Sequence, residues 1–290
     1  MKFAIFGNCH QAKKCEKINE LFAALREWND IYAIEQNYYR FLLDNGIATD
    51  EKIEIIDSSD FNADIAISYG GDGTLLRTAS KVGNKGIPIL GINGGRLGFL
   101  TTISNEDISQ TIRNIHLDEY EIEERNLIEL KAEGTTLSNY PFALNEIAIM
   151  KHDSSAMMTL EATLNGSDCI TYQADGLIVS APSGSTGYSL SVGGPIIAPD
   201  ASVMVLTPIA SHSLNARPIV VNDSTTVRIK ANSRSHNFLI AIDGRNESCN
   251  EDVILTIKKA PYKQRIIRSK GTSFIKSLRE KLMLGADTRR

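Results

Sequence analysis

The sequence predicts an α/β + all-β fold, with an N-terminal Rossmann-like α/β domain followed by a C-terminal β-sandwich domain. The first hundred residues alternate short β-branched runs with longer segments of helical periodicity, as parallel strands joined by helical crossovers do. From about Tyr120 the apolar runs are short and closely spaced, and helical periodicity nearly vanishes. A length of 290 residues, 42% of them apolar, is enough for two cores.

The first domain, residues 1–115, is predicted from alternating strands and helices. Short apolar runs mark its strands at 2–6, 53–56, 64–68 and 87–92. Apolar residues recur at helical spacing at 18–28, at 32–44, which Asn45-Gly46 follows as a stop signal, and at 75–82. This order of elements indicates a parallel sheet.

The second domain, residues 116–269, is predicted from many short strands. Asn165-Gly166, between two of them, is a typical hairpin turn. The runs fall at 127–131, 143–150, 158–164, 169–173, 177–180, 203–206, 226–230, 238–242, 253–257 and 265–268. Such a series favours a β-sandwich. Residues 270–285 have apolar side chains on one helical face, so we expect a C-terminal helix that packs back on the first domain.

The charge balance argues against some classes of partner. A formal net charge of -4 and a pI of about 5.8 provide no field to hold a nucleic acid or an anionic membrane, so neither partner is predicted. The apolar run 3–6 is too short for a signal peptide, and we expect a cytoplasmic protein. The four cysteines and five histidines lack metal-ligand spacing, so no metal site built by the protein alone is expected.

A glycine-rich loop with a carboxylate follows the third predicted strand. In residues 70–74, Gly-Gly-Asp-Gly-Thr, the glycines permit positive φ and let backbone N–H groups approach a phosphate. The loop opens a helix at the carboxyl end of a strand, where open α/β sheets bind ligands. It matches neither the P-loop nor the dinucleotide fingerprint. Arg77, one turn further on, is a candidate phosphate contact, although an exposed helical arginine is equally well explained by solvation.

Asp72 is the prime catalytic candidate. A carboxylate beside phosphates is repulsive unless it holds a metal ion or accepts a proton from an attacking hydroxyl, and both are kinase tasks. The alternative is a tight Asp-Gly turn with Thr74 as a helix cap. Three glycines at the end of a strand favour the catalytic interpretation.

Two further segments suggest ligand binding. Residues 93–100 form a second glycine-rich loop after a strand, close in sequence to the first. An ordinary loop whose apolar side chains pack into the core explains these residues equally well. Asn145 and Glu146 interrupt an apolar strand. An amide can read an adenine edge and a carboxylate can accept hydrogen bonds from a ribose diol. Alternatively, one of these two side chains faces solvent and the other caps a turn, which would satisfy their hydrogen bonds equally well.

Residues 174–195 are the densest run of hydroxyls and glycines in the chain. Short hydroxyl side chains and open backbone amides bond sugars, amides and phosphates, and the ring of Tyr188 can lie flat against a base. A flexible linker would have a similar composition. Apolar strands flank the run closely, and Pro182 and Pro195 stiffen its ends, so we favour a binding segment.

These segments resemble known motifs. Residues 70–74 are similar to the signature loop of the NAD kinase, diacylglycerol kinase and phosphofructokinase superfamily. Residues 93–100, the pair at 145–146, and residues 174–195, 206–218 and 243–244 resemble NAD kinase motifs in family order. Ser183 and Gly187 stand where the third family motif usually has threonine and alanine.

The resemblance implies an NAD kinase, which phosphorylates the 2'-hydroxyl of the adenosine ribose of NAD with ATP to give NADP. It implies a divalent cation, Mg2+, held mainly by the donor phosphates. It also implies a homotetramer or homodimer in which neighbouring subunits help to complete the site. Asp72 is expected to be catalytic. The residues expected to bind substrate and nucleotide are Gly70, Gly71, Gly73, Thr74, Arg77, Asn145, Glu146, Asp175, Ser183, Thr186, Gly187, Tyr188, Ser189, Leu190, Ser191, Ala210 and Arg245.

Two other functions fit part of the pattern. A lipid or sphingoid-type kinase shares the glycine-aspartate loop, but it would call for an apolar entrance or a basic membrane-facing patch, and the sequence shows neither. A non-catalytic NAD(P)-binding sensor would keep the fold and lose the reaction, and the presence of Asp72 argues against it.

Overall fold

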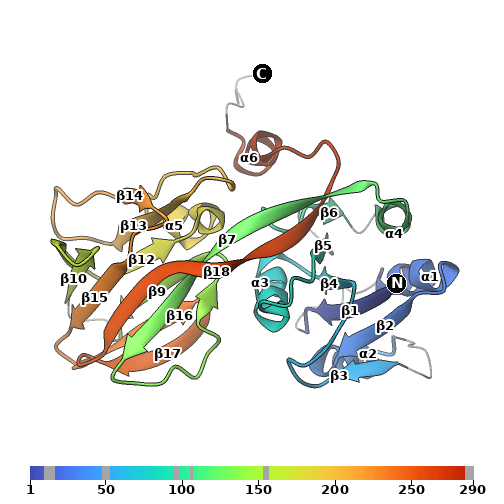
Figure 1. Cartoon of the computed structure of the whole chain (residues 1–290), viewed down its shortest axis with the longest axis horizontal. Helices are drawn as coiled ribbons and strands as arrows, with labels where there is room; N and C mark the ends of the chain where they lie inside the picture. The colour runs from blue at the N-terminus through green and yellow to red at the C-terminus, as the bar shows by residue number, and fades with distance from the viewer. Residues whose placement is uncertain (10–16, 48–52, 95–97, 105–106, 153–156, 285–290) are drawn as a thin grey trace. The chain divides into compact units, whose positions relative to one another are not determined.

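The computed structural model describes residues 1–9, 17–47, 53–94, 98–104, 107–152 and 157–284, and the chain forms two compact units (Figure 1). Unit 1 comprises Met1–Glu124 and Gln264–Arg290, and unit 2 comprises Arg125–Lys263. The chain leaves unit 1 within β7 (Tyr120–Glu133) and returns to it within β18 (Ile254–Ser269). No helix in the described ranges is long and apolar enough to cross a membrane.

Unit 1 is built on a parallel sheet. Its strands lie in the order β5-β4-β1-β2-β3, and β6 and the end of β18 also pair with β5 in parallel. The strands are β1 (Lys2–Gly7), β2 (Ile31–Glu35), β3 (Glu54–Ile56), β4 (Ile65–Tyr69), β5 (Ile89–Asn93) and β6 (Ile103–Ser104). The helices are α1 (Ile18–Glu27), α2 (Gln36–Asp44), α3 (Asp72–Val82), α4 (Ile108–His116) and α6 (Phe274–Leu282).

The burial of these elements follows their sequence patterns. Every residue of β4 and β5 is buried, as expected for central strands of a parallel sheet covered on both faces. In contrast, α1 buries one stripe, which includes Leu21, Phe22 and Leu25, and exposes its charged side. The sheet shares one apolar core with α1, α2 and α4.

The prediction of a single helix over 32–44 is wrong in its first part. Residues Ile31–Glu35 form β2, which pairs with β1 on one side and β3 on the other. Sheet pairing overrides the helical periodicity here, because Tyr32 and Ile34 belong to the core of unit 1. The carboxylate of Glu35 then accepts the N–H of Tyr38 at 2.9 Å and caps α2.

Unit 2 contains two antiparallel sheets. One has the order β14-β13-β12-β9-β16-β17, and the other contains β11-β10-β15-β18 with β7 pairing β18 and β8. The first comprises β9 (Glu146–Lys151), β12 (Gly176–Ser180), β13 (Val203–Ile209), β14 (Ile219–Asn222), β16 (Asn237–Ile242) and β17 (Arg245–Asn250). The second includes β8 (Phe142–Ala143), β10 (Met158–Leu164), β11 (Asp168–Ala174) and β15 (Val227–Asn232). A 3-10 helix, η3 (Pro182–Thr186), and the short α5 (Tyr188–Ser191) follow β12.

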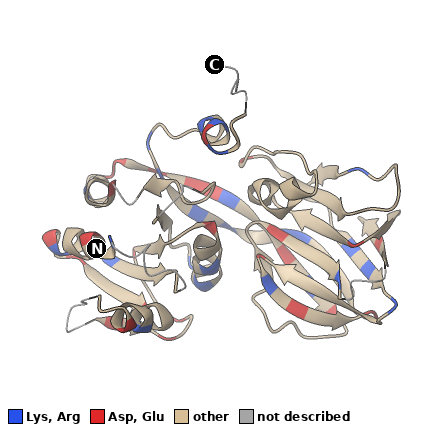
Figure 2. Ribbon diagram, turned by 180° about the vertical axis from the view of Figure 1, so that it is seen from behind, with Lys and Arg blue, Asp and Glu red and all other residues tan. Residues whose placement is uncertain are grey.

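The two sheets of unit 2 enclose one core. Alternate residues of β9, Ile147 and Ile149, face this core together with Leu160 of β10 and Ile229 of β15. The unit is therefore a sandwich, and the predicted fold class is confirmed. Acidic and basic residues are interspersed in both units (Figure 2).

Candidate functional site

The turn after β4 depends on one of its three glycines. Gly70 has a φ of 155°, and a Cβ there would lie 2.4 Å from Thr74 Oγ1, so only glycine fits. Gly71 and Gly73 have open space where a Cβ would lie. Gly71 is the N-cap of α3, which begins at Asp72. The open positions therefore border the positive end of a helix dipole, where an anionic group is favoured.

The carboxylate of Asp72 is bonded by the segment 98–101, which follows the neighbouring strand β5. Its Oδ2 accepts the N–H of Phe99 at 2.8 Å. Its Oδ1 accepts the N–H of Leu100 at 3.1 Å, the N–H of Thr101 at 2.9 Å and the Thr101 hydroxyl at 2.8 Å. A carboxylate offers about four acceptor positions. Oδ1 is therefore fully used, whereas Oδ2 accepts a single donor from the described residues.

Gly98 and Arg268 fix the rest of this segment. A Cβ at Gly98 would lie 1.8 Å from Asp72 Oδ1, so a side chain there would displace the carboxylate. Arg268 of β18 donates to the carbonyl of Leu100 at 3.2 Å and to that of Phe99 at 3.3 Å. The N–H of Gly98 bonds the carbonyl of Thr101 at 2.9 Å.

Lys281 of α6 brings a cation to the same segment. Its Nζ lies 4.9 Å from the centre of the Phe99 ring. Among the described residues this ammonium has no hydrogen-bond partner. Burial lowers the pKa of Lys281, and the negative charge of Asp72 opposes that shift. The sequence patterns gave no signal for Lys281.

In unit 2, Asp243 holds the Asn145-Glu146 pair through the backbone. Its Oδ1 accepts the N–H of Asn145 at 2.9 Å and that of Glu146 at 3.1 Å, and its Oδ2 accepts the N–H of Leu144 at 2.7 Å. Asp243 has a φ of 46° and Gly244 a φ of 78°, so they form the two-residue turn between β16 and β17. The turn thus aims its carboxylate at the start of β9.

The side chains of this pair are half-buried, and each has one buried acceptor atom without a hydrogen bond. Asn145 Oδ1 and Glu146 Oε2 have no hydrogen-bond partner in the described part of the chain. Burial, and then the charge of Asp243, raise the pKa of Glu146 to about 7, although the N–H of Tyr188 opposes the shift. A buried acceptor without a hydrogen bond lowers the stability of the folded state by about 1–3 kcal/mol. A ligand group that donates a hydrogen bond to either atom would therefore be favoured.

The dense hydroxyl and glycine run packs against the Asn145-Glu146 pair. Ser180 of β12 is the register partner of Glu146. A Cβ at Gly184 would lie 2.1 Å from the carbonyl oxygen of Asn145, and one at Gly187 would lie 2.9 Å from Glu146 Oε2. Both glycines are therefore required by close approach, and the structure brings together the residues predicted at 145–146 and 183–188.

Several hydroxyls of this run are committed to the protein itself. The Ser189 hydroxyl bonds that of Thr207 at 2.9 Å, and both residues are fully buried. Ser183 Oγ accepts from the buried Arg125 at 3.1 Å, and Thr186 Oγ1 donates to the Ser183 carbonyl at 3.3 Å. Tyr188 is 38% exposed. Leu190 is half-buried and Ser191 is exposed.

Asp175 and Ala210 lie apart from this group. Asp175 bonds Lys151, the last residue of β9, at 2.7 Å, and its N–H bonds the carbonyl of Ile209, just before Ala210. Glu146 is the first residue of β9. At about 3.4 Å per residue, the two ends of this strand are about 17 Å apart. Within one chain, the structure therefore does not bring these two predicted residues to the Asn145-Glu146 pair.

Arg245 supports the chain before β9. One Nη donates to the carbonyls of Tyr140 at 3.3 Å and Phe142 at 2.8 Å. Burial lowers the pKa of Arg245 and the nearby Asp243 charge opposes the shift. Arg245 was predicted to bind a nucleotide, but its described hydrogen bonds are to backbone carbonyls.

The described residues contain no cluster of three or more His, Cys, Asp or Glu side chains that could hold a metal ion.

Comparisons with known proteins give one family. A family model described as the ATP-NAD kinase N-terminal domain matches residues 10–120, and one described as the ATP-NAD kinase C-terminal domain matches residues 144–269. A curated NAD kinase from Bacteroides fragilis is 48% identical over 289 residues and covers 100% of both chains. The NAD kinase of Flavobacterium psychrophilum is 43% identical, also over 100% of both chains, and that of Porphyromonas gingivalis is 42% identical over 99% of both.

Two solved structures are similar over almost the whole chain. The yeast NADH kinase complexed with NADH superposes with a TM-score of 0.90 at 20% identity, covering 99% of this chain and 88% of that chain. An NAD kinase from Archaeoglobus fulgidus in complex with ATP has a TM-score of 0.76 at 25% identity, covering 98% and 99%.

Proposed function

This chain belongs to the NAD kinase family, and we propose that it transfers the γ-phosphoryl group of ATP to the 2'-hydroxyl of the adenosine ribose of NAD, giving NADP and ADP. The observation that carries the proposal is the pair of buried, unbonded acceptors, Asn145 Oδ1 and Glu146 Oε2. A ribose diol supplies hydroxyl donors for Glu146, and an adenine amino group supplies one for Asn145. The Archaeoglobus relative was solved with ATP, which supports ATP as the donor.

Asp72 acts as the base in this proposal. The 2'-hydroxyl donates to Asp72 Oδ2, which accepts one hydrogen bond from the described residues, and its proton passes there as the hydroxyl oxygen bonds the γ-phosphorus. The bond from the γ-phosphorus to the bridging oxygen breaks, and ADP leaves with the electron pair. The four bonds from residues 99–101 keep the carboxylate oriented, which lowers the entropic cost of reaching the reactive geometry.

The first experiment measures NADP formation from NAD, ATP and Mg2+ with an NADP-specific dehydrogenase. Native protein should produce NADP, whereas Asp72→Asn should lose at least about a hundredfold in kcat because it lacks the base. Binding of NAD without any turnover would instead support a non-catalytic sensor.

Thr101→Val is the matched control for Asp72→Asn. It removes one hydrogen bond to Oδ1 and leaves the carboxylate in place, so kcat should fall less than about fivefold. Equal losses in the two variants would show that Asp72 serves to hold the segment 98–101 and is not the base.

Other parts of the proposal come from the family resemblance. A divalent ion, Mg2+, accompanies the triphosphate and is bound mainly by its phosphates. The enzyme acts in the cytoplasm. It assembles as a homodimer or homotetramer, and the separation of Asp175 and Ala210 from Glu146 supports a site that a neighbouring subunit completes. The family assignment favours NAD over a lipid as the acceptor.

A further inference from the structure

The last helix of unit 1, α6, turns a lysine toward the protein where an apolar residue would be expected. Its less exposed residues recur at the spacing of one helical face, and they are Phe274, Ser277, Leu278 and Lys281. On the same helix the apolar Ile275 is 62% exposed. Burial of an apolar side chain stabilises a fold, whereas burial of a charge costs free energy. Packing alone therefore does not explain the position of Lys281.

The ammonium of Lys281 is withdrawn from water without gaining a partner in the protein. Its Nζ is buried and has no hydrogen-bond partner in the part of the chain that the structure describes. The neighbouring acid on the helix, Glu280, lies 4.0 Å from Lys276 on the exposed side. An ammonium offers three donors. An anionic group that reached Lys281 would therefore gain hydrogen bonds and relieve the cost of burying the charge.

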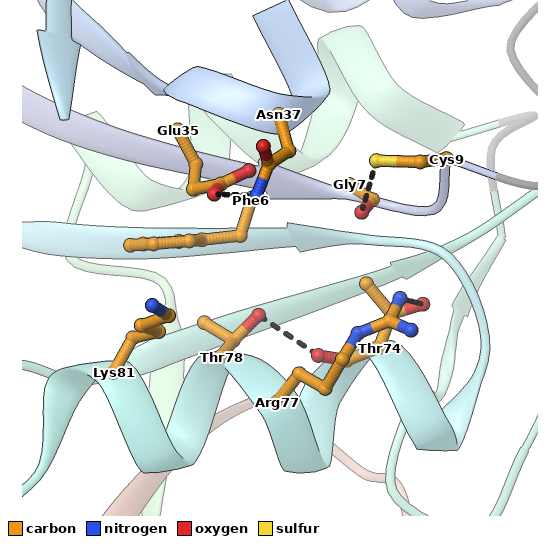
Figure 3. A pocket seen from close by; sticks show the side chains of 9 residues that line it. All are labelled: Phe6, Gly7, Cys9, Glu35, Asn37, Thr74, Arg77, Thr78 and Lys81. Atoms are coloured by element: carbon orange, nitrogen blue, oxygen red, sulfur yellow. Dashed lines mark hydrogen bonds between the residues drawn. The ribbon is translucent and has the colours of Figure 1, made fainter. Parts of the chain in front are cut away.

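Two other cations near the glycine-rich loop lie in a different environment. Arg77 and Lys81 of α3 are exposed and line a surface pocket at the end of β1 (Figure 3). Arg77 makes a hydrogen bond of 3.4 Å to Thr74 Oγ1. Bulk water solvates exposed cations such as these. The buried Nζ of Lys281 lacks that solvation, which makes it the more unusual of these cations.

Phe99 brings the ammonium of Lys281 to Asp72. The centre of the Phe99 ring lies 4.9 Å from Nζ, and the N–H of Phe99 donates to Asp72 Oδ2 at 2.8 Å. One residue thus links the cation of α6 with the carboxylate oxygen that accepts the proton in the proposed reaction. Burial lowers the pKa of Lys281, and the charge of Asp72 opposes that shift while the charge of Arg268 adds to it. A bound phosphate would favour the charged ammonium again.

We propose that Lys281 binds the phosphoryl group that is transferred at Asp72. Its ammonium donates hydrogen bonds to the nonbridging oxygens of the γ-phosphoryl group during transfer, and to the 2'-phosphate of NADP afterwards. Lys281 forms no covalent bond and keeps its three protons, so the bonds made and broken in the reaction stay as described above. A cation here neutralises charge on the transferring group and lowers the barrier. This inference rests on the proposed function, because it assigns a further residue to that reaction.

Binding of NADP compared with NAD tests the proposal without turnover. Only NADP carries the 2'-phosphate, so Lys281→Met should raise Kd for NADP at least about tenfold, the loss expected for a hydrogen bond between charged groups. Kd for NAD should change less than about twofold. Lys281→Arg keeps the charge and should bind NADP within about threefold of the native protein. Calorimetric titration measures each Kd. An unchanged Kd for NADP in Lys281→Met, or an equal rise for NAD, would overturn the proposal.

Lys276→Met is the matched control. Lys276 lies on the same helix with an exposed side chain, 4.0 Å from Glu280. Its replacement removes one positive charge from α6 and leaves Lys281 in place, so Kd for NADP should stay within about twofold of the native value. An equal loss of NADP affinity in Lys276→Met and Lys281→Met would attribute the effect to the net charge of the helix and refute the contact.

A purely structural role for Lys281 would have a different signature. Methionine is also long and packs favourably against aromatic rings, and it replaces a buried ammonium that has no described partner. Lys281→Met should therefore keep or raise the urea midpoint of unfolding. A lower midpoint, together with equal losses of NAD and NADP affinity, would show that Lys281 only anchors α6.

Kinetics separate this inference from the proposed function. Lys281→Met should lower kcat at least about tenfold, with KM for NAD changed less than about twofold. If no NADP forms with any donor, but Lys281→Met selectively weakens NADP binding, the proposed reaction is wrong and the phosphate contact remains. If NADP forms, but Lys281→Met matches the native protein in kcat and in Kd for NADP, only the role of Lys281 is wrong.

Discussion

A single carboxylate organises the candidate residues in each of the two units. Asp72 bonds the segment 98–101, and Asp243 bonds the backbone of residues 144–146. The sequence predicts Asp72 as the catalytic candidate from a local signal, a carboxylate among glycines at the end of a strand. The sequence did not predict that Asp243 holds the backbone of residues 144–146. It showed only that Asp243-Gly244 resembles a family motif. Its bonds span about a hundred residues, and an Asp-Gly pair predicts a turn without showing what the carboxylate reaches.

The elevated pKa of Glu146 predicts a pH-dependent KM for NAD. Below pH 7 the carboxyl is mostly protonated, and above it the ionised carboxylate accepts both hydroxyls of the ribose more strongly. KM for NAD should therefore fall about tenfold between pH 6 and pH 8. Steady-state kinetics at constant ionic strength measure it. In Glu146→Gln the profile should be flat over this range, and a retained slope would assign the titration to another group.

Asp243→Asn should shift the pH dependence of KM for NAD to lower pH. The like charge of Asp243 is the second cause of the raised Glu146 pKa, so its removal shifts the midpoint below 7, while burial keeps it above the ordinary value. Asparagine also tolerates the left-handed backbone of this turn. Glu247→Gln is the control, because Glu247 likewise accepts two backbone N–H groups in unit 2, from Ser138 and Asn139. A midpoint that stays at 7 in Asp243→Asn would limit Asp243 to a structural role.

Element boundaries were predictable where local signals and tertiary pairing agreed. The strand 64–68 and the helix 75–82 were found because the buried run and the glycine punctuation coincide, and they correspond to β4 and α3. The segment 32–44 was misread because its first residues are both helical in spacing and apolar enough for a strand. Only the partners β1 and β3 decide between these alternatives. The C-terminal helix was expected to bury several apolar residues, but only Leu278 is buried and Ile275 is 62% exposed.

The β16–β17 turn should be sensitive to a Cβ at Gly244. With φ at 78°, Gly244→Ala should lower the free energy of unfolding by about 1–2 kcal/mol and raise KM for NAD, because the turn carries Asp243. Urea denaturation and initial-rate kinetics measure the two effects. Gly46→Ala, at a φ of 69° and also in open space, should cost similar stability without changing KM for NAD. An equal rise in KM for NAD in Gly244→Ala and Gly46→Ala would mean that KM for NAD follows the loss of stability and not the position of Asp243.

At the scale of the whole molecule, composition and strand spacing predicted both folds, because each domain has its own periodicity. The predicted boundaries at 115 and 269 stay predictions. The two compact units divide within β7 and β18, strands that contribute residues to both units. A continuous strand carries no composition change at such a point, so sequence alone has no signal there. Likewise, the motif order could not show that Asp175 lies about 17 Å along β9 from Glu146.

This separation predicts that two defective variants restore activity when they assemble together. Asp72→Asn and Asp175→Ala should each lose most activity alone, because each lacks one contribution to every site. Co-expressed and purified through two different tags, they should recover a measurable fraction, since some sites then receive both intact residues from different subunits. NADP formation per site is the readout. Mixed assemblies no more active than the better single variant would place Asp175 outside the site.

The segment 99–101 has one more consequence, for the variability of the protein. Its N–H groups all bond Asp72, and its carbonyls bond Arg268 and Gly98, so no peptide group is left over. The path of this segment is therefore specified without the ring of Phe99. Position 99 can therefore accept other side chains without altering the path of the loop.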